Sequence, residues 1–353
     1  MHLWNSMISE FHLKNIAIFE DFEWNGLGSV NLVIGENDTG KSHLLKLLYA
    51  VTRSLQDYKR KQTSDAPRWS DVLSEKLRWV FQPPDFSLGE LVRKGERRLR
   101  VNCRVCDEPV FFAFGESTTK QINDASAAPK PSRDVRTLFF PPKEVLTPRK
   151  AIITLREQQE VAGFGDTYYD LAKALGHATT RGRIQANLDA VLNRLEDLFE
   201  GTIEQEDDEF VFKRGQGPKK FSMSQTAEGV KKIGLIAHLI RNRNIKSGSV
   251  LFFDEPAAHL HPQAAIAFVE MLYEMSKAGI QLFVATHSYL VLKQFELLAR
   301  EHDDQTPLCV LSPAESGGVN ADFADLRDRI PQNSIVDASV GLFDREIEMS
   351  LHR

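Results

Sequence analysis

The stretch Gly35-Glu36-Asn37-Asp38-Thr39-Gly40-Lys41-Ser42 matches the pattern G-x-x-x-x-G-K-[ST] at every fixed position. In this pattern the glycines let the backbone turn, so that successive N–H groups point into one concavity at the start of a helix and bind phosphate. We expect Lys41 to face solvent and reach the β- and γ-phosphates of a nucleotide, and Ser42 to ligate Mg²⁺. The predicted nucleotide-binding residues are Gly35, Asn37, Asp38, Thr39, Gly40, Lys41 and Ser42.

The segments on either side have the order that such a loop requires. Residues 29–34 form an apolar run typical of a buried strand, and apolar side chains from Leu44 to Val51 recur at helical spacing. This order of strand, glycine loop and helix favours a phosphate-binding loop over a plain glycine turn between two core elements.

A second apolar run, residues 249–253, is followed directly by two carboxylates. A carboxylate at the end of a strand beside a phosphate-binding loop holds Mg²⁺, and a neighbouring one can act as a general base. We therefore assign Asp254 to the metal and Glu255 to the base. A third apolar run, residues 280–285, precedes His287, which is placed at the same sheet edge and is interpreted as a γ-phosphate sensor.

The net charge and the length of the apolar runs limit which kinds of partner the chain can have. The chain has 353 residues, and 44 Lys and Arg against 49 Asp and Glu give a net charge of −5. Such a chain has no overall attraction to nucleic acid or to an anionic membrane, so a nucleic-acid surface would have to be local. No apolar run is long enough to span a membrane, and the first ten residues do not resemble a signal peptide, so we expect a cytoplasmic protein.

Between the two halves of the site lies a more irregular region. Residues 99–105 and 110–114 predict a hairpin that turns at residues 107–109, and helices are predicted at 151–160, 168–175 and 184–199. Residues 117–133 are predicted to be a mobile loop. Arginines crowd residues 93–104; we favour a solvated face of an edge strand over a phosphate-binding patch.

Two further pairs of residues are weaker metal candidates. Cys103 and Cys106 form a C-x-x-C without a second pair, which favours two half-buried thiols in a strand. His259 and His261 follow the carboxylates closely, and a metal there is the less favoured interpretation.

The order of motifs resembles the ATP-binding-cassette-type ATPase heads of the SMC, RecF and OLD branch, known in bacteria as AAA-family ATPases. Residues 11–19 are similar to their opening strand, 35–42 to Walker A, 251–256 to Walker B and 286–288 to the switch histidine. Residues 257–262 are similar to the segment that follows Walker B in OLD-like members, where it lies at the dimer interface.

This resemblance implies an α/β fold: a P-loop NTPase head of ABC type with an antiparallel β-subdomain and a helical lobe. It implies a nucleotide-binding lobe of residues 1–54 and 223–335, an inserted β-hairpin and helical lobe of residues 55–222, and a C-terminal tail of residues 336–353. It also implies ATP and Mg²⁺ as cofactors. Two ATP molecules would lie between two heads, so a homodimer is expected.

Two departures from the family pattern matter. The signature motif that would contact the partner's ATP aligns with Glu228 and Gly229, and glutamate stands where serine is expected. A glutamate facing a γ-phosphate would be repelled unless it turned away or paired with Lys231. The glutamine of the Mg²⁺-sensing loop has no clear counterpart: residues 141–144 look like its surroundings, and Gln158 and Gln159 are weak candidates.

The chain lacks the heptads of an SMC rod, and too few residues follow about residue 313 for the nuclease domain of OLD proteins. We therefore expect a slow ATPase subunit that regulates a separately encoded effector, as in bacterial anti-phage or toxin-like systems. One alternative is a RecF-like repair ATPase, whose turnover duplex DNA would raise. The other, less favoured, is the nucleotide-binding subunit of a transporter, which would copurify with membrane protein.

Overall fold

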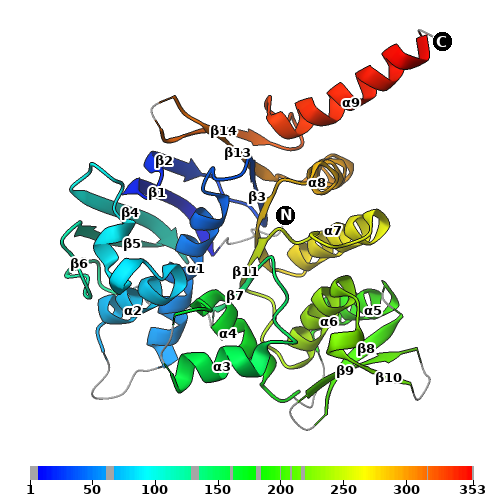
Figure 1. Ribbon diagram of the computed structural model, residues 1–353, viewed down its shortest axis with the longest axis horizontal. Helices are drawn as coiled ribbons and strands as arrows, with labels where there is room; N and C mark the ends of the chain where they lie inside the picture. Colours follow the sequence, from blue (N-terminus) through cyan, green and yellow to red (C-terminus); the bar gives the residue numbers. More distant parts are fainter. Residues whose placement is uncertain are drawn as a thin grey trace.

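The computed structural model describes residues 7–60, 67–128, 135–159, 162–179, 184–198, 200–206, 209–215, 219–315 and 317–351. Its centre is a six-stranded sheet in the order β14-β13-β3-β12-β11-β7 (Figure 1). All neighbouring strands are parallel except β13 and β14. The strands are β3 (Val30–Gly35), β7 (Arg136–Phe140), β11 (Ser249–Asp254), β12 (Gln281–Thr286), β13 (Pro307–Pro313) and β14 (Val319–Asp325).

The apolar runs form the middle of this sheet because both of its faces are covered. Alternate side chains enter two cores: Leu32 and Ile34 of β3 pack in one, and Val33 packs in the other. Helix α1 (Lys41–Arg60) lies in the second core, and α7 (Pro262–Lys277) and α8 (Tyr289–His302) cover the opposite face (Figure 1). The predicted order of strand, loop and helix is therefore confirmed.

A five-stranded antiparallel sheet, β2-β1-β4-β5-β6, packs against the other side of α1. Its strands are β1 (Ile8–Ile16), β2 (Phe19–Asn25), β4 (Arg98–Val105), β5 (Glu108–Gly115) and β6 (Asp124–Ala125). The predicted hairpin is present as β4 and β5. The arginine-rich strand is not at an edge, however, because β4 pairs with β1 on one side and β5 on the other. An edge strand and an inner strand of an antiparallel sheet can both have one solvated face, so the alternation of polar and apolar residues could not distinguish them.

The helical lobe contains α3 (Arg149–Glu157), α4 (Asp166–Leu175), α5 (Ala186–Leu198), α6 (Glu228–Arg241) and a small sheet in the order β10-β9-β8. The small strands are β8 (Gly201–Glu206), β9 (Glu209–Arg214) and β10 (Lys220–Ser222). Helix α2 (Trp69–Phe81), which the sequence reading missed, packs on α1, and the short 3₁₀ helices are η1 (Pro84–Phe86), η2 (Leu88–Leu91) and η3 (Met223–Gln225).

Two elements cross the predicted lobe boundaries. Strand β7 belongs to the predicted insertion but pairs with β11 in the parallel sheet, and β1 belongs to the predicted nucleotide-binding lobe but pairs with β4. The predicted division into lobes therefore stays a prediction.

Residues 129–133 of the predicted loop lie outside the described residues. Most of the predicted tail forms α9 (Ser334–Leu351), which projects from the body (Figure 1). No described helix has the length and apolarity needed to cross a membrane.

Candidate nucleotide site

The loop between β3 and α1 requires both of its glycines. Gly40 has φ +86°, and a Cβ there would lie 2.8 Å from Ile18 and Phe19. A Cβ on Gly35 would lie only 2.3 Å from the carbonyl oxygen of Leu311. A side chain at Gly35 would therefore displace the backbone of β13, and one at Gly40 would displace Ile18 and Phe19, where β1 turns into β2. The closely packed loop at the start of a helix fits a phosphate group, because its N–H groups have no intrahelical acceptor.

The sequence led us to expect that Lys41 faces solvent. It is buried instead, with only 8% of its surface exposed. Its Nζ donates to the carbonyl oxygen of Gly35 at 2.8 Å and to that of Glu36 at 2.5 Å. Burial lowers the pKa of Lys41, and Glu255 and Asp254 oppose the shift. The loop therefore folds around the ammonium group, which lies at its inner surface.

The two predicted metal ligands meet. The Ser42 hydroxyl donates to Oδ1 of Asp254 at 3.0 Å, although 212 residues separate them. Asp254 ends β11, and α1 begins beside it, so the carboxyl end of the sheet brings the residues together. Burial raises the pKa of Asp254, with a further contribution from Glu255, while Ser42 and two lysines oppose it. A buried carboxylate whose pKa stays raised is under-compensated, and a divalent cation would compensate it.

Glu255 and His287 form a second contact at the same edge. Nδ1 of His287 lies 2.6 Å from Oε1 of Glu255, and the backbone N–H of His287 donates to the same oxygen at 3.1 Å. The hydroxyl of Thr286 donates to Oε2 at 3.1 Å. The His287 side chain is 61% exposed and that of Glu255 only 18%. The carboxylate is thus fixed in orientation by β12, and the imidazole faces the solvent side.

Lys232 is a site residue that sequence reasoning missed. Its Nζ donates to the carbonyl oxygen of Ala258 at 3.1 Å and to that of Glu255 at 3.4 Å. Glu255 itself has φ 52°, a conformation that L-residues rarely adopt. Lys232 therefore stabilises the turn that presents the Glu255 side chain. Lys232 lies at the end of the stretch compared with the signature motif. Nothing in the sequence around it indicates a contact with the turn after β11.

The signature residues lie at the start of α6. Glu228 is its first residue and accepts a hydrogen bond from Nζ of Lys231 at 2.9 Å. A Cβ on Gly229 would lie 2.6 Å from a methyl group of Leu260, in the segment after Walker B. The glutamate therefore pairs with Lys231, as required if it is not to repel a phosphate, and the glycine allows α6 to approach this segment.

Comparisons with known proteins agree with this geometry. Residues 30–293, well over half of the chain, match the family model described as "AAA domain, putative AbiEii toxin, Type IV TA system". The chain belongs to this AAA-domain family. Its fold is that of an SMC head, a P-loop NTPase fold. No curated protein sequence matches it.

Solved structures of SMC heads share the fold. An Smc head bound to the C-winged-helix domain of ScpA superposes with a TM-score of 0.53 at 13% identity, covering 92% of this chain and 99% of that one. A Pyrococcus furiosus Smc head with an extended coiled coil, bound to the C-terminal domain of ScpA, gives 0.50 at 12% identity, covering 91% and 97%. At such low identity these likenesses establish the fold of this AAA-domain protein and nothing further.

Residues 141–144, which the sequence likened to the surroundings of the glutamine loop, lie near Asp254. Lys143 and Glu144 line a small cavity together with Lys232 and Asp254, next to the end of β7. Gln158, by contrast, is the C-cap of α3 and does not line this cavity. No glutamine lines this cavity in the described part of the chain, so the place of a glutamine loop stays a prediction.

The other candidates from the sequence have partners of their own. In the arginine-rich strand, Arg98 pairs with Asp124, and Arg104 pairs with Glu10 at 2.9 Å. Cys103 is buried, which raises its pKa to about 12. Across the described ranges, no three His, Cys, Asp or Glu side chains gather as a metal site. His261 instead caps α7, where its Nδ1 accepts from the N–H of Gln263 at 3.3 Å.

Proposed function

We propose that this chain binds Mg·ATP and hydrolyses it to ADP and phosphate. The observation that carries the proposal is the convergence of Ser42, Asp254, Glu255 and His287 at one edge of the sheet, from the start of α1, the end of β11 and the end of β12. The glycine loop and Lys41 would hold the phosphates, and Ser42 and Asp254 the metal. Bound Mg²⁺ would neutralise charge on the phosphate oxygens.

In this proposal Glu255 takes the proton of the attacking water. Its carboxylate is directed by three hydrogen bonds, from the Thr286 hydroxyl and from the backbone and ring of His287. A base held in one orientation presents its free lone pairs to the water without further ordering. The exposed imidazole would bind the γ-phosphate and so link the base to the occupied site.

We further propose that two copies close around ATP and that the closed state regulates a separately encoded effector. The dimer rests on the resemblance to SMC and RecF heads, in which the signature of one head completes the site of the other. The effector role rests on the toxin-like family that the chain matches. Hydrolysis would then end the closed state.

Replacing Glu255 by glutamine tests the chemistry. The amide keeps the shape but accepts a proton poorly, so hydrolysis should fall at least about a hundredfold, within the range a positioned base contributes. ATP binding should persist, and the variant should accumulate as an ATP-bound dimer, measured by phosphate release and light scattering. Glu274→Gln, an exposed change on α7, is the matched control.

An active Glu255→Gln enzyme would refute the assignment of the base. A variant that stays monomeric with Mg·ATP would refute the dimer while leaving the base intact. Affinity purification of the native protein with mass spectrometry of what accompanies it tests the effector separately.

A further inference from the structure

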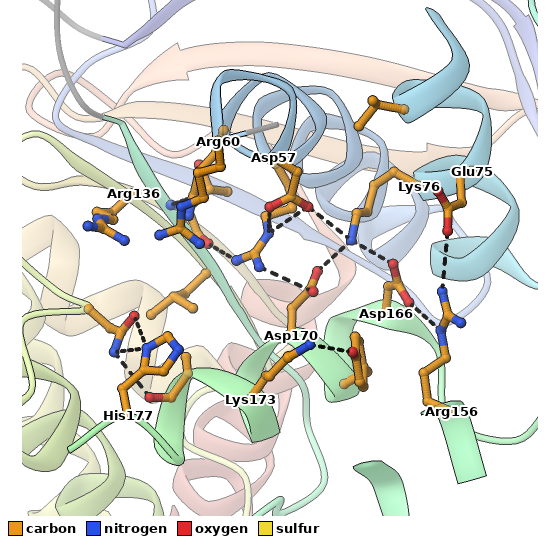
Figure 2. Close-up of a pocket in the computed structure, with 18 residues that line it drawn as sticks. Asp57, Arg60, Glu75, Lys76, Arg136, Arg156, Asp166, Asp170, Lys173 and His177 are labelled. Carbon is orange, nitrogen blue, oxygen red and sulfur yellow. Dashed lines mark hydrogen bonds and ion pairs between the residues drawn. The ribbon is translucent and has the colours of Figure 1, made fainter. Parts of the chain in front are cut away.

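A second cavity lies at the opposite end of α1 from the nucleotide site. It has a volume of about 380 Å³ and is bounded by α1, α2, α4 and the first residues of β7 (Figure 2). Ser42 and Asp57, at the two ends of the helix, are separated by about 22 Å at 1.5 Å per residue. This volume is within the range of small-molecule sites, which begins near 300 Å³.

The lining of this cavity is positively charged in a chain that is negative overall. Six lysines and arginines line it against four acids, a surplus of two positive charges, while the whole chain carries −5. The six cations are Arg53, Arg60, Lys76, Arg136, Arg156 and Lys173. Cations concentrated in a concave site raise the local concentration of anions.

Asp166 and Asp170 are engaged by the cations at the buried side, whereas Glu75 is 53% exposed and lies 3.9 Å from Arg156. Nζ of Lys76 lies 2.6 Å from Asp166 and 2.9 Å from Asp170. Arg53 pairs with Asp170 at 3.3 Å, and Arg156 with Asp166 at 3.2 Å. These carboxylates are therefore satisfied within the wall, and they oppose an incoming anion less than their number suggests.

Two of the six cations, Arg60 and Lys173, are exposed. Arg60 is exposed and forms no ion pair with any residue in the described ranges. Figure 2 shows Arg60 and Arg136 on one side of the cavity and His177 and Lys173 on the other. Lys173 pairs with Glu157 at 3.0 Å, but its side chain remains 53% exposed. Groups from α1, β7 and α4 thus converge on one space.

We propose that this cavity binds a small phosphorylated ligand, no larger than a mononucleotide, at a site separate from the phosphate-binding loop. Arginine and lysine side chains bind phosphate through charge-assisted N–H donors, and the exposed Arg60 and Lys173 supply such donors. The inner network of Arg53, Lys76 and Asp170 holds the wall rigid, so the site is formed before the ligand arrives. The cavity volume of about 380 Å³ suits a ligand of that size.

The test uses calorimetric titration with inorganic pyrophosphate and with AMP, in a Lys41→Ala background that removes the loop's own phosphate contact. Pyrophosphate and AMP separate an inorganic from a nucleotide ligand. We expect one site per chain in Lys41→Ala for at least one probe. Adding Arg60→Glu should weaken that binding at least about tenfold, the loss expected when one charge-assisted contact is reversed.

Arg97→Glu, an exposed charge reversal on the antiparallel sheet near β4, is the matched control and should leave the affinity unchanged. Lys173→Gln gives a second, milder variant at the opposite side of the cavity and should weaken binding in the same direction. The proposal is overturned if neither probe binds Lys41→Ala at millimolar concentration, or if Arg60→Glu and Arg97→Glu bind equally well. Neither result depends on whether the protein hydrolyses ATP.

Discussion

Two buried aspartates at opposite ends of α1 show how similar groups are prepared for different roles. Asp254, beside the phosphate-binding loop, has a pKa raised by burial and accepts one side-chain hydrogen bond, from Ser42. Asp170 is as deeply buried, and burial alone would raise its pKa, but Arg53 and Lys76 lower it to about 2. It also accepts a hydrogen bond from the Tyr49 hydroxyl at 2.6 Å.

The difference separates a ligand site from a structural network. A buried carboxylate surrounded by cations stabilises the fold, because its charged form is favoured in the native state. A buried carboxylate that is left under-compensated costs stability until a cation binds. Asp254 is therefore our proposed metal ligand, and Asp170 belongs to the network that joins α1, α2 and α4.

Asp170→Asn should have the largest effect on stability. Removing one partner from a buried charge network typically costs about 3 to 5 kcal/mol, and here Arg53 and Lys76 would keep only Asp57 and Asp166 as partners. We expect a loss of about 3 kcal/mol in the free energy of unfolding, measured by urea denaturation. Asp21→Asn, at an exposed aspartate that contacts His12 at 2.5 Å and Lys14 at 3.6 Å, is the control and should change it by less than about 1 kcal/mol.

The same network predicts a dependence on pH. The folded pKa of Asp170 is about 2 and its usual value is 3.8, so its contribution to stability is complete above pH 3.8 and is lost as the pH falls toward 2. The neighbouring Asp166 opposes this, because burial raises its pKa. Stability in Asp170→Asn should therefore fall less between pH 4 and 2 than in the wild type. An unchanged slope would contradict the role given to Asp170.

Asp254→Asn should act in the opposite direction on stability and strongly on binding. A pKa raised in the folded state means that the charged carboxylate costs free energy at neutral pH, a cost that is greatest above the folded pKa. The neutral amide should leave the nucleotide-free protein as stable as the wild type or up to about 1 kcal/mol more stable. Mg²⁺-dependent affinity for ATP should fall at least about tenfold in calorimetry. A variant that is less stable and binds ATP with normal affinity would contradict this role and give Asp254 the structural role assigned to Asp170.

The sequence identified the nucleotide site because each half is a contiguous motif. Ser42 and Asp254 both follow buried strands, and parallel strands place their carboxyl ends together, so their meeting could be predicted. The sequence placed Glu255 and His287 at the same edge of the sheet, but it could not predict that the two side chains are in contact. The burial of Lys41 could not be foreseen, because it depends on the loop carbonyls that its own side chain reaches.

The charged cavity could not be predicted, because its residues share no local pattern. Arg53 and Asp170 are separated by 117 residues and meet only after α1, α2 and α4 have packed. Helix α2 was missed for a related reason: its N-cap is Arg68, not one of the short polar residues that announce a helix. Local signals thus defined the motifs, and tertiary packing defined the second cavity.

Glu228 extends the comparison to an exposed acid and gives the smallest expected effect. Its side chain is 44% exposed, and its pair with Lys231 at 2.9 Å contributes little to stability. Its position at the first residue of α6 favours negative charge, because the N–H groups of the first turn carry partial positive charge. Glu228→Ser should therefore cost at most about 1 kcal/mol of stability.

The same substitution should raise ATP turnover a few-fold if α6 contacts the nucleotide of a partner head. Serine removes a negative charge that would face the γ-phosphate, and its hydroxyl can donate a hydrogen bond there. Glu228→Gln removes the charge but not the length of the side chain, so it separates the two causes. Phosphate release is measured for both variants at several protein concentrations, since a dimer effect must grow with concentration. If Glu228→Ser leaves turnover unchanged or lowers it, the glutamate does not stand in for the signature serine, and α6 does not complete the site of a second copy in the way proposed.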